Sequence, residues 1–205
     1  MNIITLGGGI VDSNSYIMYQ ENIGVLIDAG VKTEAILDKL YKNNIELKYI
    51  ILTHGHADHT YNAKELREKT NAKIIAHENE KELINDASTN CSYFVRIVPK
   101  VLIPDILVKD NDTLEIFDDK LQFIHTPGHT VGSMCIKYKN ILFSGDTLFR
   151  NSIGRTDFPT GNFVTLENSI RNKLYRLKNE TIVYTGHGEP TTIGYEKINN
   201  FFVKQ

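Results

Sequence analysis

The densest run of metal-binding residue types in this chain is His54-Gly55-His56-Ala57-Asp58-His59. It directly follows an apolar segment, Tyr49–Thr53, whose Ile-Ile-Leu run predicts a buried strand. Imidazole and carboxylate groups are the standard ligands for zinc and related divalent metals. Alternate residues of an extended chain point the same way, so His54 and His56 can reach one metal together. Asp58 and His59, where the chain turns toward the next helix, can face a second metal.

Three later segments repeat this layout, in which an apolar strand ends beside a glycine and a ligand-type residue. These residues are His129 after Pro127-Gly128, Asp146 after Ser144-Gly145, and His187 after Thr185-Gly186. Each alone is more typical of a structural turn. Together with the first cluster they make a set of seven, which fills two three-ligand sites that share one bridging carboxylate. The expected sites are His54, His56 and His129 with Asp146, and Asp58, His59 and His187 with Asp146.

Hydrophobic periodicity and turn residues predict strands and helices along the whole chain. We expect strands at Asn2–Leu6, Ser15–Tyr19, Gly24–Asp28, Tyr49–Thr53, Lys73–Ala76, Thr113–Phe117, Gln122–His125, Met134–Lys137, Ile141–Ser144 and Thr181–Thr185. We expect helices at Thr33–Lys42 with Thr33 as N-cap, Asn62–Lys69, Glu78–Asn85, Leu166–Leu177 and Gly194–Phe202. Long loops are expected at 87–110 and 149–163. This order predicts two sheets sandwiched between helices.

Length and composition indicate a single domain over residues 1–205 and exclude several classes of protein. The formal net charge of -2 disfavours a nucleic-acid-binding face. No apolar run approaches the ~20 residues of a membrane span, and the N-terminus lacks the pattern of a secretory signal. The two cysteines, Cys91 and Cys135, cannot form a disulfide framework. We therefore expect a cytoplasmic protein without nucleic-acid or membrane partners; the oligomeric state is left open.

Four motifs carry a resemblance to a known family: His-x-His-x-Asp-His at 54–59, Pro-Gly-His at 127–129, Gly-Asp-Thr at 145–147 and Gly-His-Gly at 186–188. In this order they resemble the metallo-β-lactamase superfamily. Within it, residues 145–149, 152–158 and 186–194 are similar to the glyoxalase II group (hydroxyacylglutathione hydrolases), particularly its short bacterial members. The resemblance implies an α/β (α+β) metallo-β-lactamase fold, a four-layer αββα sandwich with the metals at the sheet edges.

The activity that this resemblance implies is hydrolysis of a thioester by a dinuclear metal centre, through attack of a metal-bound hydroxide on the carbonyl. Asp58 is then both a metal ligand and a catalytic residue that orients the nucleophile. Zinc is the metal we expect because it binds a thiolate leaving group well, with iron and manganese as alternatives. The expected partner is a small acyl-thiol or ester substrate. Asp28 is either an ordinary turn residue or a partner that orients the histidine loop.

Arg155 is the residue that we expect to bind substrate. In glyoxalase II a basic residue nine positions after the bridging aspartate contacts a carboxylate of the thiol cofactor, and Arg155 has that offset from Asp146. A loop ion pair with Asp157 is the alternative. The sequence departs from the animal-type enzyme, which has tyrosines at the positions of Asp157 and Glu189 and a C-terminal helical extension after the region of Gly194. The resemblance therefore implies thioester hydrolysis more strongly than use of glutathione.

Other activities stay open at this stage. A mononuclear iron persulfide dioxygenase of the same superfamily shares the signature at residues 154–158 and would use His56 or its neighbour, His129 and Asp146. A lactonase or another esterase is a further alternative. The bridging Asp146 and the lack of a signal peptide argue against a β-lactamase. His77 and His125 are expected to be structural, and the apolar segment 91–108 is either a lid or a packed connector.

Overall fold

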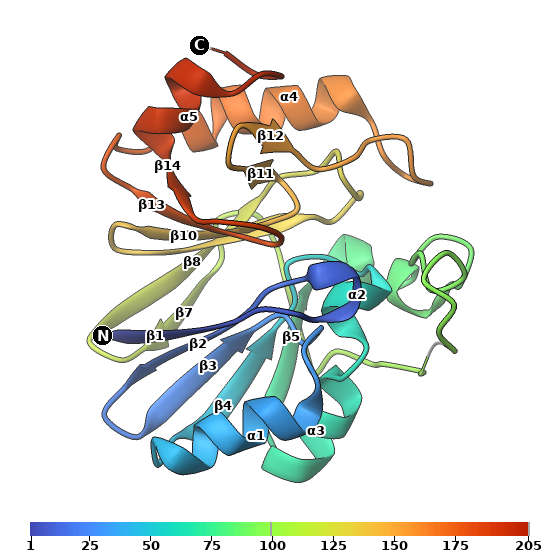
Figure 1. The fold of residues 1–205 in the computed structure, drawn as a ribbon, viewed down its shortest axis with the longest axis vertical. Coiled ribbons are helices and arrows are strands. Elements are labelled where there is room, and N and C mark those ends of the chain that lie inside the picture. Colours follow the sequence, from blue (N-terminus) through green and yellow to red (C-terminus); the bar gives the residue numbers. More distant parts are fainter. Residues whose placement is uncertain (99, 205) are drawn as a thin grey trace.

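The computed structural model describes residues 1–98 and 100–204 of the chain. Its first sheet has the strand order β1-β2-β3-β4-β5-β6. These strands are β1 (Asn2–Leu6), β2 (Ser15–Gln20), β3 (Ile23–Ile27), β4 (Glu46–Ile51), β5 (Lys73–His77) and β6 (Ile106–Val108). The outer face of this sheet is covered by α1 (Thr33–Lys42) and α3 (Ala63–Thr70), and the short α2 (Ala57–Thr60) lies at its edge (Figure 1).

The second sheet faces the first and has the strand order β14-β13-β10-β9-β8-β7. These strands are β7 (Thr113–Ile116), β8 (Asp119–His125), β9 (Met134–Tyr138), β10 (Ile141–Gly145), β13 (Ile182–Thr185) and β14 (Thr191–Thr192). The helices α4 (Phe163–Asn172) and α5 (Ile193–Asn199) cover its outer face, next to a small hairpin of β11 (Leu148–Phe149) and β12 (Ser152–Ile153). The expected four-layer αββα sandwich is confirmed.

Alternation along the strands explains the layers, because successive side chains of a strand point to opposite faces. In β3, Val25 and Ile27 pack between the sheets, whereas Leu26 packs beneath the helices of the first half. In β10, Phe143 packs between the sheets and Leu142 packs beneath α4. Each such fully buried side chain contributes about 1.5–3 kcal/mol to stability. The apolar strand runs in the sequence therefore specify both faces of each sheet.

Two of the predicted helices differ from the structure at their starts or along their length. The prediction of a helix at Glu78–Asn85 is wrong: this segment forms two 3-10 turns, Glu78–Glu80 and Leu83–Asn85. The carboxylate of Glu80 is buried and bonded to backbone on other loops, and this holds the segment away from a regular α-helix. Thr33 is the first helical residue and not the N-cap; its hydroxyl donates to Glu65 instead.

The C-terminal part also differs from the sequence prediction. The helix expected at Leu166–Leu177 is α4, which begins earlier because the Asn162 side chain caps it by accepting from the Thr165 N–H; a 3-10 turn at Leu174–Arg176 follows its end. The predicted loop 87–110 contains β6, and the predicted loop 149–163 contains β12 and the end of β11. Among the described residues, none of the helices has the length and apolar character to cross a membrane.

The strand directions place the functional loops at one edge of the sandwich. Strands β3 to β6 run parallel to one another, and β10 runs parallel to β13. Their carboxyl ends carry Asp28, the 54–59 segment, Asp146 and His187. Loops at the carboxyl ends of parallel strands are the usual place for binding sites in α/β proteins.

Candidate metal centre

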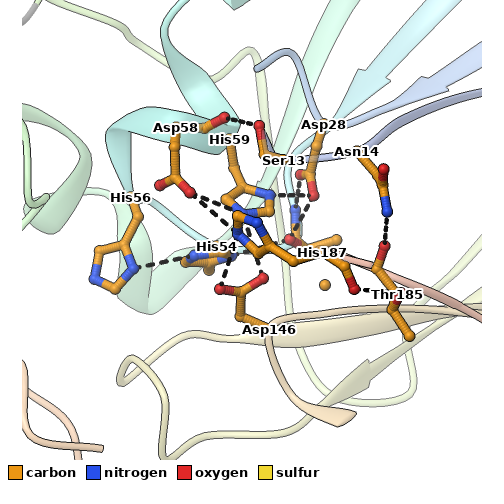
Figure 2. Close-up of polar contacts among 12 residues, drawn as sticks. Ser13, Asn14, Asp28, His54, His56, Asp58, His59, Asp146, Thr185 and His187 are labelled. Carbon is orange, nitrogen blue, oxygen red and sulfur yellow. Dashed lines mark hydrogen bonds and ion pairs between the residues drawn. The ribbon is translucent and has the colours of Figure 1, made fainter. Parts of the chain in front are cut away.

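All seven residues of the predicted set lie together at this edge, although four separate loops supply them. Figure 2 shows the side chains of Asp58, His59 and His187 pointing toward Asp146. Three groups have ligand atoms within 4.8 Å of one another: His54, His56 and His129; His54, His59 and Asp146; and Asp58, His59 and His187. The first and third groups correspond to the two predicted sites, and the second joins them.

The trihistidine half of the cluster consists of His54, His56 and His129, all of which are buried. The Nδ1 atom of His56 lies 3.1 Å from Nε2 of His54 and 2.9 Å from Nε2 of His129. Burial, reinforced by the neighbouring imidazoles, lowers the pKa of His56 to about 3 and holds the pKa of His54 well below its usual value. Neutral imidazoles with converging nitrogens suit a cation, since tetrahedral ligands about 2.1 Å from zinc lie about 3.4 Å apart.

The carboxylate half consists of Asp58, His59 and His187. Nε2 of His187 lies 3.3 Å from an Asp58 oxygen, and Nε2 of His59 lies 3.4 Å from the same oxygen. Burial acts to lower the pKa of both histidines, but the surrounding carboxylates outweigh it, raising the pKa of His187 to about 9 and that of His59 well above its usual value. Burial likewise acts to raise the pKa of Asp58, but the two imidazoles hold it far below its usual value.

Asp146 lies between the two halves. One carboxylate oxygen is 3.3 Å from Nε2 of His59, and the other is 3.5 Å from both His129 and His187. The first oxygen, Oδ1, is buried and has no hydrogen-bond partner within the described part of the chain. A Cβ atom at Gly186 would come within 2.1 Å of it, so the loop after β13 needs a glycine there. A buried carboxylate without a regular hydrogen bond at one oxygen, and with imidazole nitrogens of both halves within 3.5 Å, fits a bridging position between two cations.

Three of the histidine rings are held by a second contact through their other nitrogen, which fixes their orientation. The contacts are His54 Nδ1 to Thr53 Oγ1 at 3.0 Å, His59 Nδ1 to Asp28 Oδ2 at 2.8 Å, and His129 Nδ1 to the Arg155 carbonyl at 2.7 Å. Of the two interpretations of Asp28, the structure therefore supports the orienting partner. The sequence does not indicate the contact between the Arg155 carbonyl and His129, because any residue type offers the same backbone carbonyl.

Glu80 is a second feature that the sequence did not reveal. Its buried carboxylate accepts the Gly55 N–H at 2.6 Å, the Gly132 N–H at 2.6 Å and the Thr130 hydroxyl at 2.6 Å. Burial raises the pKa of Glu80, and these three donors partly oppose the shift. Glu80 thus ties the loop of His54 and His56 to the loop of His129. By contrast, His77 and His125 stack on each other with ring centroids 4.0 Å apart, outside the cluster.

A pocket of about 290 Å³ adjoins the cluster, and its lining includes His56, Asp58, His129, Asp146 and His187. Arg155 lies on its wall, but its guanidinium donates to both oxygens of Asp157, at 2.9 and 2.7 Å. The structure therefore contains the ion pair that the sequence left as an alternative to substrate binding. From the 91–108 segment, Cys91, Phe94 and Val95 line the pocket, as a lid would.

Known proteins resemble this chain over nearly its whole length. Hydroxyacylglutathione hydrolase GloC of Haemophilus influenzae is 35% identical over 193 residues, which cover 92% of this chain and 91% of that protein. The crystal structure of the BLEG-1 B3 metallo-β-lactamase superposes with a TM-score of 0.94 at 33% identity, covering 100% of both chains. The crystal structure of TTHA1623 in a di-iron-bound form gives a TM-score of 0.87 at 30% identity, covering 98% of this chain and 100% of the other.

The family resemblance noted in the sequence agrees with these similarities and with the layered fold. The family model described as "Metallo-beta-lactamase superfamily" matches residues 8–187 of this chain, and this range includes all seven residues of the cluster. The His-rich cluster also lies where this fold gathers the carboxyl ends of its parallel strands. This chain belongs to the metallo-β-lactamase superfamily.

Proposed function

We propose that this protein is a dinuclear metal-dependent hydrolase of thioesters. The observation that carries the proposal is the position of Asp146, whose buried carboxylate lies within 3.3–3.5 Å of histidines from two groups of three ligand-type residues. We assign His54, His56 and His129 to one metal, Asp58, His59 and His187 to the other, and Asp146 to both. The similarity to GloC of Haemophilus influenzae supports a thioester substrate, and the di-iron form of TTHA1623 supports two metals.

Two divalent cations bound there would lower the pKa of a water molecule and polarise the carbonyl under attack. The protein's own contribution is to position and orient. Asp58 faces the pocket, and its neighbouring histidines keep its carboxylate ionised, so it can accept a hydrogen bond from the attacking water. Thr53, Asp28 and the Arg155 carbonyl hold the imidazole rings in place before substrate arrives. Zinc suits this histidine and aspartate donor set, which iron and manganese also accept.

The test combines metal analysis of the purified protein with a parallel screen of substrates. The substrates are S-lactoylglutathione, other acyl thiols, a simple lactone and glutathione persulfide, which represent the activities that the sequence leaves open. A β-lactam joins the screen because of the similarity to BLEG-1 over the whole chain. We expect two metals per chain and fastest turnover on a thioester. One iron per chain with oxygen uptake on the persulfide, or faster turnover of the lactone or β-lactam, would contradict the proposal.

A further inference from the structure

We infer that the pocket beside the metal cluster takes an uncharged apolar group of the substrate, so that the preferred thioesters carry an aliphatic or aromatic chain next to the scissile bond and not the dicarboxylate of glutathione. This inference rests on the proposed hydrolysis and names its substrate class. It comes from the chemistry of the pocket wall beside the histidine and aspartate residues of the cluster. The apolar group can lie on the acyl side or on the thiol side of the ester.

Aromatic rings flank the metal cluster at both ends of the pocket. The ring of Phe158 lies 5.7 Å from the ring of His56 in an edge-to-face arrangement, and Phe94 lies 5.8 Å from Phe158. At the other end, Phe149 lies 5.9 Å from His187 with the two rings perpendicular. All three phenylalanines line the pocket. A chain that enters toward the metals therefore passes between aromatic side chains, which bind apolar and aromatic groups well.

The pocket also displays apolar side chains that the fold does not bury. Val11 lines it with 62% of its surface exposed, and Phe94 is likewise 62% exposed. The backbone of Val11 has φ 54°, a strained value for a β-branched residue. Strain of this kind gathers at ligand-binding positions, and exposed apolar side chains around a cavity indicate an apolar ligand.

Charge in the pocket points the same way. Among the described residues that line it, Arg155 is the only lysine or arginine. Its guanidinium is already bonded to both oxygens of Asp157 and lies 4.1 Å from the ring centroid of Phe158. Away from the residues assigned to the metals, a ligand carboxylate on the pocket wall would lose hydration and find only a guanidinium that is already paired, which is costly. An apolar chain instead gains up to about fourfold in binding for each methylene that it buries.

The experiment measures kcat/KM on two series of uncharged thioesters with the metal-loaded protein. In one series, the acyl group of N-acetylcysteamine thioesters is lengthened from acetyl to hexanoyl. In the other, the alkyl group of S-alkyl thioacetates is lengthened from ethyl to hexyl. We expect a rise of about tenfold or more along at least one series. We also expect the best of these substrates to exceed S-lactoylglutathione. The steeper series identifies the side of the ester that enters the pocket.

Variants locate the effect. Phe158→Ala and Phe149→Ala should flatten the dependence on chain length, while Tyr41→Ala, an aromatic removed from an 88% exposed position on α1, should leave it unchanged. Flat profiles in both series, or S-lactoylglutathione as the best substrate, would overturn the inference while leaving thioester hydrolysis intact. If no ester is hydrolysed, the proposed function fails. Calorimetry with the hexanamide and acetamide analogues of the thioesters then decides: tighter hexanamide binding supports an apolar pocket, and equal binding overturns it.

Discussion

The two halves of the cluster both contact Asp146, but they shift the pKa values of their histidines in opposite directions. In the trihistidine half, burial lowers the pKa of His54 and His56, so these rings are neutral before any metal arrives. In the carboxylate half, nearby carboxylates raise the pKa of His59 and His187, so these rings hold protons in the metal-free protein at pH 7. One half is therefore ready for a cation, whereas the other must release protons to bind one.

The largest effect should come from the residue that the halves share. Asp146→Ala removes the oxygens that lie 3.3–3.5 Å from histidines of both halves. We expect loss of bound metal from both sites and turnover below detection, measured by elemental analysis and thioester hydrolysis. Asp118→Ala, at an exposed position outside the cluster, is the control. Full metal content and full activity in the Asp146 variant would refute the dinuclear assignment.

The next largest effect concerns the support of the trihistidine half. Glu80→Ala leaves the buried N–H groups of Gly55 and Gly132 without their acceptor, at about 1–3 kcal/mol each. The free energy of unfolding of the metal-free protein should therefore fall by about 2–6 kcal/mol, and Glu80→Gln should lose less. Urea denaturation measures this difference, with Glu82→Ala as the exposed neighbouring control. Equal stability of the Glu80→Ala and Glu82→Ala proteins would show that Glu80 does not hold the loops.

The matching test of the carboxylate half changes Asp28. Asp28→Asn keeps the shape of the side chain but removes the charge that the Nδ1 atom of His59 contacts at 2.8 Å. Loss of such an orienting partner typically weakens metal binding about 10–100-fold. We expect the second equivalent of zinc to bind more weakly by that factor, as measured by competition with a chromophoric chelator. The first equivalent should weaken less, because Asp28 reaches His54 only through the Thr53 hydroxyl, which donates to Asp28 at 2.8 Å. Equal weakening of both equivalents would erase the distinction between the halves.

The dependence on pH should separate the halves in the unmodified protein. Because the pKa of His187 is raised to about 9, a metal entering the carboxylate half at pH 7 displaces its proton. The pKa of His59 is raised as well, so up to two protons are displaced. Apparent affinity there should rise by up to about a hundredfold per pH unit near neutral pH, and less steeply above pH ~9, where His187 has already lost its proton. His56, with a pKa of about 3, adds no such slope in the trihistidine half. Zinc titrations in different buffers count the protons released; identical counts for both equivalents would contradict this prediction.

The smallest effect is expected for Arg155→Ala. The side chain is 64% exposed and paired with Asp157, while the contact to His129 comes from the backbone carbonyl, which the substitution keeps. Metal content should be unchanged, and KM for an uncharged thioester should change by less than about threefold. A large rise in KM for an anionic thioester alone would instead support the prediction that Arg155 binds a substrate carboxylate.

The sequence could indicate that these seven residues lie together, because each follows an apolar strand within a few positions and strand ends gather at one edge of the sandwich. It could not predict the inward turn of Glu80, whose partners lie 25 to 52 residues away and whose segment has the spacing of an amphipathic helix. The contact from the Arg155 carbonyl and the strained backbone of Val11 were equally hidden. Local patterns reveal side-chain types and their period, whereas these features depend on packing between distant loops.

Zinc titration of the metal-free protein, followed by thioester hydrolysis at each step, tests the dinuclear assignment most directly. Two metals that act together predict activity that continues to rise until two equivalents of zinc per chain are bound. Binding that stops at one equivalent, with activity already at its maximum, would contradict the shared role of Asp146 and the function built on it.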